Sequence, residues 1–270
     1  MMKLSIITIN LNNREGLKKT IESVFEQTFE DFDYIVIDGG STDGSRELIE
    51  RYSDRFSYWV SEPDSGIYNA MNKGIVKAKG EYVLMLNSGD WLANENVLES
   101  MALHLDGTDI VQGNLLVSQD GEWLKISGYG RSDLTFRDAY KGAFLHQASF
   151  IRKALHDQYG LYDETWRISG DTAFFLKTLG FGDATFKYVD MTVSCAEPWG
   201  LSSNTTPYWK RIHQKEDERY DALLPHRLLR MCKEEEKKVK LYDDLHENRL
   251  IWKCVMALRK LAEMQGRKKK

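Results

Sequence analysis

Short apolar runs alternate with amphipathic stretches through the first hundred residues of the chain. The segment 14–27 is of the helical kind, because Leu17, Ile21 and Val24 recur at the spacing of one helix face. The same patterns predict strands at 3–10, 32–38, 56–62 and 81–87, and helices at 14–27, 46–52, 66–80 and 94–105. This repeating order predicts parallel strands joined by right-handed crossovers, as in a Rossmann-like sheet.

The pattern changes from about residue 110 onward. The expected elements are antiparallel strands at 109–117 and 122–130 around a Ser-Gln-Asp-Gly turn, a helix at 170–182, and a strand or pair of strands at 186–197. Beyond residue 200 the chain is helical in pattern and rich in charge. We therefore expect an α/β fold with a mainly parallel sheet, a small antiparallel part and a C-terminal helical region, with domains at 1–200 and 201–270.

The charge of the chain is distributed unevenly. The net charge is -4, but residues 201–270 hold 18 basic against 11 acidic residues, which leaves residues 1–200 at -11. An acidic body argues against nucleic acid as the main ligand. The basic C-terminal region either faces an anionic surface or is a solvated helical face.

The cysteines and the N-terminus bear on the compartment. Cys195, Cys232 and Cys254 lie far apart without Cys-x-x-Cys spacing, which favours a reducing compartment over a disulfide framework. The first apolar run is too short for a signal sequence or for a membrane span of about 20 residues. We expect a cytoplasmic protein.

Polar residues follow three of the expected strands. The first strand carries Thr8 and Asn10 near its end, the second ends in Asp38, and the fourth leads to Asn87 and Asp90. Each of these is by itself a common turn or capping residue. Ligands bind outside the carboxyl ends of parallel strands, however, and three such clusters on one edge predict a ligand site.

Four segments carry a family resemblance, which spans about residues 3 to 195. SIITINLNN, YIVIDGGSTDGS, EYVLMLNSGD and SGDTAFFLKTLG resemble, in this order, the signatures of the family 2 glycosyltransferases, which have the GT-A fold. EPDSGIYNAMNKGI is similar to a subgroup that makes bacterial surface polysaccharides. The resemblance implies a metal-dependent, inverting glycosyltransferase that moves a hexose-type sugar from a nucleotide-diphosphate donor to a saccharide acceptor.

The resemblance also implies the donor contacts. Asp38 would accept the ring N–H of a uracil or guanine base, so the donor is UDP- or GDP-linked. Thr8 and Asn10 would line the same pocket. The family often has a second Asp after Asp38, and this chain has Gly39 there. The alternatives for these side chains are an Asx turn and local capping of the backbone.

The strand-four motif implies a cation. The family's Asp-x-Asp is replaced by Asn87 at the first acidic place, and Asp90 closes the turn. Mg²⁺ or Mn²⁺ can bind through one carboxylate, an amide carbonyl and phosphate oxygens, so Asp90 is the expected metal ligand. Lys73 would meet the donor diphosphate or face solvent. The alternative for Asp90 is an N-cap of the helix near Asn94.

The acceptor hydroxyl needs a base, and the matching family position is Asp171 at the start of a helix. Gly170 replaces the first member of the family's Glu-Asp pair, and a simple helix cap is the alternative for Asp171. His146 and Gln147 are candidates for diphosphate or acceptor contacts. Trp166 and Trp199 are candidates for stacking on sugars or for core packing.

The C-terminal segment from residue 239 has a helical apolar pattern with basic residues accumulating toward its end. It predicts either an interfacial helix on anionic lipid, which suits a lipid-linked acceptor and a peripheral site at the inner face of the cell membrane, or a helix packed on the catalytic domain or on a homodimer partner.

Two other functions stay open. A nucleotidyltransferase that makes a sugar nucleotide would need a Gly-rich basic loop after the first strand, which Asn-Leu-Asn-Asn-Arg-Glu-Gly supplies poorly. A catalytically degenerate, sugar-nucleotide-binding subunit would fit the departures at Gly39, Asn87 and Gly170.

Overall fold

The computed structural model describes residues 2–119, 122–197 and 206–247. The chain forms two compact units, Met1–Glu216 and Asp217–Lys270. The boundary between the units falls inside the helix α8 (Pro207–Asp221), later than the domain boundary at residue 200 that the change in composition predicts.

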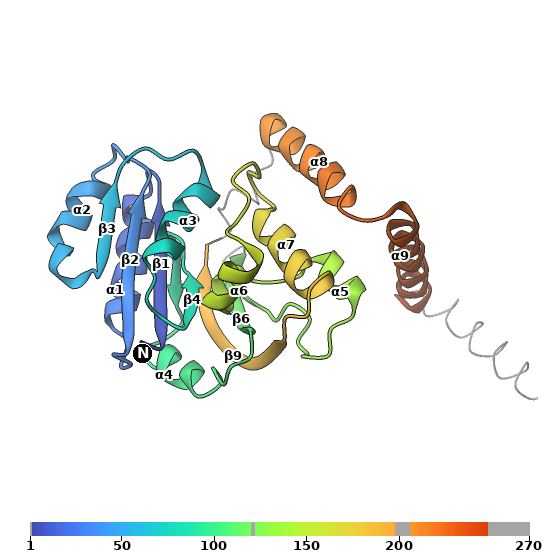
Figure 1. The fold of residues 1–270 in the computed structure, drawn as a ribbon, viewed down its shortest axis with the longest axis horizontal. Coiled ribbons are helices and arrows are strands. Elements are labelled where there is room, and N and C mark those ends of the chain that lie inside the picture. Colours follow the sequence, from blue (N-terminus) through green and yellow to red (C-terminus); the bar gives the residue numbers. More distant parts are fainter. Residues whose placement is uncertain (1, 120–121, 198–205, 248–270) are drawn as a thin grey trace, which may run out of the picture. The chain divides into compact units, whose positions relative to one another are not determined.

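The parallel part of the sheet forms from the first half of the chain (Figure 1). Its strands are β1 (Leu4–Asn10), β2 (Phe32–Asp38), β3 (Tyr58–Ser61) and β4 (Tyr82–Met85), in the order β3-β2-β1-β4. The helices between and after them are α1 (Arg14–Phe25), α2 (Ser45–Arg51), α3 (Ile67–Lys77) and α4 (Val97–Ala102), with a short 3-10 turn at Ser53–Arg55. The predicted alternation of strands and helices is confirmed.

Helices cover both faces of these strands. Ile6 belongs to the same buried cluster as Leu17 and Ile21 of α1. Ile7 points to the other face, where a Cβ placed on Gly74 of α3 would lie 2.4 Å from its side chain. Every residue of β1 is buried, including the polar Ser5, Thr8 and Asn10, as expected of a parallel strand covered on both faces.

The sheet continues beyond β4 with mixed strand directions. The further strands are β5 (Asp90–Leu92), β6 (Ile110–Gln119), β7 (Glu122–Ile126), β8 (Ser149–Arg152) and β9 (Phe186–Ala196), in the order β4-β8-β6-β9-β5 with β7 paired to β6. The β6–β7 hairpin is antiparallel, as predicted, and β8 runs antiparallel to both β4 and β6. β6 and β9 are parallel to each other.

The remaining helices of the first unit lie around this second half of the sheet. They are α5 (Phe136–Lys141), a 3-10 turn at His146–Ala148, α6 (Lys153–Tyr159), α7 (Gly170–Phe175) and a π-helical turn at Leu176–Gly180. The helix predicted at 170–182 is therefore present, with a π-helical end.

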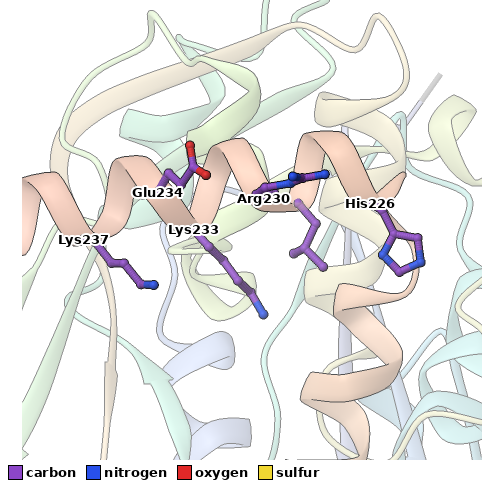
Figure 2. Close-up of a pocket in the computed structure, with 6 residues that line it drawn as sticks. His226, Arg230, Lys233, Glu234 and Lys237 are labelled. Carbon is purple, nitrogen blue, oxygen red and sulfur yellow. The ribbon is translucent and has the colours of Figure 1, made fainter.

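The second unit contains the end of α8 and α9 (His226–Glu247). A shallow hollow along α9 is lined by His226, Leu229, Arg230, Lys233, Glu234 and Lys237 (Figure 2). The predicted membrane or dimer helix lies largely outside the described residues. Within the described ranges, no helix combines the length and the apolar character that a membrane crossing requires.

Candidate active site

The carboxyl ends of the parallel strands meet at one edge of the sheet. The register pairs Asn10 of β1 with Asp38 of β2, and Asp38 with Ser61 of β3. The chain leaves β4, the neighbour of β1 on its other side, toward Asn87. This edge, where the sequence predicts a ligand site, therefore gathers polar side chains from four neighbouring strands.

The Asp38 carboxylate organises the turn at the end of β2. It is fully buried and accepts hydrogen bonds from Asn10 Nδ2 (2.7 Å), Ser61 Oγ (2.6 Å), and the backbone N–H (3.0 Å) and hydroxyl (2.5 Å) of Ser41. Burial raises the pKa of Asp38, but the hydrogen bonds outweigh burial and hold this pKa below its ordinary value. The structure thus brings Asn10 and Asp38 together around an ionised carboxylate.

Gly39, which follows this carboxylate, lies against Asp64. A Cβ placed on Gly39 would come within 2.5 Å of Asp64 Oδ2. Asp64 is half-buried and accepts the backbone N–H of Gly66 at 2.9 Å. The space that a second aspartate would enter is therefore occupied by a carboxylate from the segment before α3.

Thr8 is not part of this group. Its side chain is fully buried, its hydroxyl donates to the Leu86 carbonyl at 2.8 Å, and the same hydroxyl lies 3.0 Å from that of Tyr34. These contacts place Thr8 in the core between strands, and its nucleotide contact stays a prediction.

Asn87 and Asp90 enclose a tight turn. The Asp90 N–H donates to the Asn87 carbonyl at 2.9 Å, and Gly89 has a φ of 101°, which favours glycine. The Thr20 hydroxyl, from α1, donates to the Asp90 carbonyl (2.6 Å) and accepts the Gly89 N–H (3.0 Å). The N-cap of α4 is Asn96, so Asp90 is not the cap of that helix.

His146 connects this turn to Asp171. Its Nε2 lies 3.3 Å from Asn87 Nδ2, and its Nδ1 lies 3.1 Å from Asp171 Oδ2. The side chains of His146 and Asp171 are only 22% and 16% exposed, so their interaction is weakly screened by water. Two segments more than eighty residues apart in the sequence, at 87 and 171, thereby meet across one imidazole ring.

The pKa values of Asp90 and Asp171 shift in opposite directions. Burial raises the pKa of Asp90 to about 6, against the opposing effects of the His146 charge and an Asn87 backbone hydrogen bond. Burial also raises the pKa of Asp171, but His146, the Thr172 N–H and Tyr68 outweigh it and hold this pKa below its ordinary value. Burial lowers the pKa of His146, yet its hydrogen bond with Asp171 and the charges of Asp171 and Asp90 raise it overall.

Tyr68 of α3 fixes the loop that leads to Asp171. Its hydroxyl donates to the Ile168 carbonyl at 2.5 Å, lies 3.1 Å from Asp171 Oδ1, and accepts the Gly170 N–H at 2.8 Å. A Cβ placed on Gly170 would lie 2.7 Å from the Tyr68 ring. Gly170 therefore makes room for this ring, and Asp171 sits in the first turn of α7 behind the N-cap residue Ser169.

The turn at Asn87 suits a divalent cation. Asn87 Oδ1 is buried and has no hydrogen-bond partner, and an amide carbonyl oxygen in this state is a suitable ligand for a hard cation. Asp90 supplies a carboxylate from the same turn. Groups of three or more His, Cys, Asp or Glu side chains arranged for a metal do not occur within 2–119, 122–197 and 206–247.

The other predicted side chains lie outside this group. Lys73 pairs with Glu62 at 2.8 Å on the surface of α3. Gln147 follows His146 in the same 3-10 turn and is half-buried. Trp166 is 3% exposed, as the core-packing alternative expects, and Trp199 lies outside the described residues.

Tyr68 is one of the side chains of this site that sequence reasoning missed. The helical spacing of 66–80 indicates which face of α3 is buried, but it does not tell which polar atom on that face finds a partner a hundred residues later. Ser41 could have been found, because it follows Asp38 by only three residues and an aspartate at a strand end commonly accepts hydrogen bonds from the turn after it.

The family is identified by sequence comparison. The sequence model of glycosyl transferase family 2 matches residues 5–160, more than half of the chain. The chain belongs to glycosyl transferase family 2. The predicted resemblance is thereby confirmed, and the Asp38 turn and the Asn87–Asp90 turn both lie within the matched region.

Relatives of this family 2 chain are themselves named as glycosyltransferases. An uncharacterized glycosyltransferase of Mycobacterium tuberculosis is 33% identical over 189 residues, which cover 64% of this chain and 68% of the relative. A PGL/p-HBAD biosynthesis glycosyltransferase of Mycobacterium bovis is 28% identical over 208 residues, 74% of this chain and 79% of the relative.

Solved structures confirm the GT-A-like fold. S. aureus TarS 1-349 in complex with UDP-GlcNAc superposes with a TM-score of 0.65 at 20% identity, covering 78% of this chain and 64% of that chain. The mannosyltransferase PcManGT from Pyrobaculum calidifontis, in complex with GDP-Man and Mn²⁺, gives a TM-score of 0.58 at 16% identity, with 82% and 63% covered. The family 2 chain thus spans less than two thirds of either solved chain.

Proposed function

We propose that this family 2 chain transfers a sugar, with inversion, from a nucleotide-diphosphate donor to a saccharide acceptor. The observation that carries the proposal is the contact of His146 with both Asn87 and Asp171. His146 thereby links the Asn87–Asp90 turn, which suits a donor diphosphate, to the ionised Asp171, which suits an acceptor hydroxyl. Both groups are held at the sheet edge where ligands bind in this class of fold.

The donor side rests on the turn at the end of β2. Asp38 and Asn10 are the hydrogen-bonded polar side chains of this turn, and Asp64 presents a second carboxylate beside Gly39. A carboxylate accepts the ring N–H of either uracil or guanine, so the base is that of a UDP- or GDP-linked sugar. The complexes of the solved relatives with UDP-GlcNAc and with GDP-Man support both donors equally.

Asp90 and Asn87 Oδ1 would hold a divalent cation, Mg²⁺ or Mn²⁺. A bound cation supplies charge neutralisation for the diphosphate leaving group. The Mn²⁺ in the complex of one solved relative supports this assignment. Lys73, paired with Glu62, contributes to the diphosphate only if that ion pair opens.

Asp171 acts as the base toward the acceptor hydroxyl. Its low pKa keeps it ionised at neutral pH, and His146 and Tyr68 fix the orientation of its two oxygens. In a single in-line displacement the acceptor oxygen attacks the anomeric carbon as its proton passes to Asp171, and the nucleoside diphosphate leaves from the opposite face. Through its contact with Asn87, His146 would stabilise negative charge that develops on the leaving diphosphate.

The names of the relatives support the proposed acceptor class, and the pattern of the C-terminal segment supports the proposed location. The named roles of relatives in PGL/p-HBAD and in teichuronic acid biosynthesis support an acceptor in cell-surface polysaccharide or glycolipid synthesis. We propose a saccharide, in lipid-linked form, as the acceptor, and a cytoplasmic enzyme peripheral to the inner face of the membrane. A homodimer through the C-terminal helix is the alternative use of that segment.

A thermal-shift screen of nucleotide sugars, with and without Mn²⁺, tests the donor and metal assignments. The matching donor should raise the melting temperature, more so with Mn²⁺. Asp171→Asn should bind donor as the wild type does and lose about 10²- to 10⁴-fold in transfer rate. The exposed control Asp133→Asn, whose side chain is 90% exposed, should retain the wild-type rate.

Donor hydrolysis separates transfer from the alternative of a binding subunit, which the departures at Gly39, Asn87 and Gly170 leave open. An active transferase releases nucleoside diphosphate slowly without acceptor, whereas a binding subunit releases none. Normal turnover by Asp171→Asn would show that Asp171 is not the base for the acceptor hydroxyl.

A further inference from the structure

Helix α8 buries a single side chain, and that side chain is charged. Glu216 is 6% exposed, whereas its neighbours along Pro207–Asp221 are half-buried or exposed. A helix usually docks through an apolar stripe, so apolar contact does not explain how this helix is held. A buried carboxylate destabilises the folded state unless it is fully hydrogen-bonded, so the partners of Glu216 decide what it does.

Those partners are consecutive backbone groups of one loop. Glu216 Oε1 accepts the N–H of Arg167, and Oε2 accepts the N–H groups of Ile168 (3.0 Å) and Ser169 (2.9 Å). Successive N–H groups that converge in this way form an anion-binding nest. Hydrogen bonds from backbone N–H to a carboxylate are stronger than neutral ones.

The loop held by Glu216 is the one that delivers Asp171. The next N–H, that of Gly170, donates to the Tyr68 hydroxyl. From Arg167 to Gly170, four successive N–H groups therefore end on two side chains, Glu216 and Tyr68. The Arg167 side chain also reaches back to the Ser65 carbonyl at 2.8 Å. Because this loop has no strand or helix partner of its own along these N–H groups, the two side chains fix its course into α7.

We infer that Glu216 is a positioning residue for the transfer reaction, acting through the 167–169 loop on the placement of Asp171 against His146. The inference rests on the proposed role of Asp171. It also extends the catalytic unit past the family match at 5–160, because α8 up to Glu216 belongs to the first compact unit. No sequence pattern marks Glu216 among the other acidic residues of this charged helix.

The test compares Glu216→Ala, Glu216→Gln and the control Glu218→Gln, an exposed glutamate of the same helix. For both Glu216 variants we expect kcat to fall about 10- to 100-fold, the size of effect that a displacement of about 1 Å of a reacting group produces. The donor KM should change less than about twofold, because the Asp38 turn and the Asn87–Asp90 turn do not contact Glu216. Glu218→Gln should match the wild type.

Formate provides the readout that a merely structural role would not move. In Glu216→Ala a small carboxylate can enter the vacated nest and restore part of kcat, whereas in Glu216→Gln the amide fills the space and formate should have no effect. The acid limb of the pH–rate profile should also shift upward in both variants, because a displaced Asp171 loses contacts that keep it ionised. If Glu216→Ala does not fold, the kcat, KM and pH profile of Glu216→Gln decide.

Three results would overturn the inference: wild-type kcat in folded Glu216→Ala or Glu216→Gln, a loss of kcat accompanied by an equal rise in donor KM, or an unshifted acid limb with no formate response. Failure of the proposed function looks different. It would appear as absent transfer by the wild type or as unimpaired transfer by Asp171→Asn.

Discussion

His146 contacts Asp171 and interacts electrostatically with Asp90, and the pKa values of these two carboxylates shift in opposite directions. Burial dominates at Asp90, whose pKa is about 6, whereas hydrogen bonds dominate at Asp171, whose pKa is low. The difference suits their proposed tasks. A base must be ionised before the acceptor arrives, while a buried carboxylate with a raised pKa is a group that gains from a cation.

Asp90→Asn should raise the stability of the ligand-free protein at high pH. The folded chain keeps a proton on Asp90 up to about pH 6, whereas the ordinary aspartate value is 3.8. Between these values the folded state binds more protons, so the free energy of unfolding falls as pH rises through this window. We expect the variant to melt a few degrees above the wild type at about pH 8, with the difference shrinking toward about pH 5, by calorimetry.

Mn²⁺ together with UDP should reverse that order, because only the wild type retains the carboxylate ligand. Equal ligand-induced shifts in the two proteins would argue that Asp90 does not hold the cation.

At the scale of elements, Tyr68 joins α3 to the loop before α7. Tyr68→Phe leaves the Gly170 N–H and the Ile168 carbonyl without their partner in a buried place. We expect a loss of about 1–3 kcal/mol in the free energy of unfolding by urea denaturation, together with a lower kcat.

Tyr162→Phe is the matched control for this loss. The ring of Tyr162 lies 5.6 Å from that of Tyr68 and its side chain is buried as well, but its hydroxyl has no hydrogen-bond partner. Its removal should therefore be neutral or stabilising. A Tyr68→Phe protein as stable and as active as Tyr162→Phe would contradict the role assigned to the Tyr68 hydroxyl.

The elements differ in how far sequence predicts them. Long periodic segments such as 14–27 and 66–80 gave helices at the expected places, because amphipathic spacing is dictated by burial against the sheet. β5 and β8 were not predicted, since three or four residues are too few to display alternation. The π-helical end of α7 likewise leaves no mark on hydrophobic spacing.

The candidate site was predictable only in part, for a related physical reason. Asn10, Asp38 and Asp90 can be predicted as site residues because they lie at or just after the ends of parallel strands, and the parallel topology brings these ends to one edge of the sheet. Tertiary packing, however, decides which hydrogen-bond donor of the site meets which hydrogen-bond acceptor. The connections of His146 to Asn87, and of Tyr68 to Gly170, span tens of residues and have no local signature.

At the scale of the whole molecule, the basic excess of residues 201–270 comes from residues 248–270, but α9 still presents a row of basic side chains. His226, Arg230, Lys233 and Lys237 recur at the spacing of one helix face and line the hollow in Figure 2. Such a basic stripe attracts an anionic lipid surface through screened electrostatics. Lys233 also pairs with Asp221, which leaves Arg230 and Lys237 as the better test positions.

Arg230→Glu/Lys237→Glu should reduce co-sedimentation with vesicles rich in phosphatidylglycerol at low salt, while neutral vesicles bind neither protein. Arg227→Glu/Lys238→Glu makes the same change in net charge at exposed positions next to the stripe. This control should bind more vesicles than the first variant. Wild-type binding that is indifferent to anionic lipid would remove the membrane hypothesis.

The close contact of Gly170 with the Tyr68 ring has an evolutionary consequence. An aromatic ring cannot yield the way a flexible chain can, so a larger residue at 170 is compatible only with a smaller or reoriented one at 68. Homologues that restore the glutamate should have lost the tyrosine, and the two positions should covary across the lineage. The residue at 170 would then be limited by the size of the side chain at 68, and not by its own place in the helix.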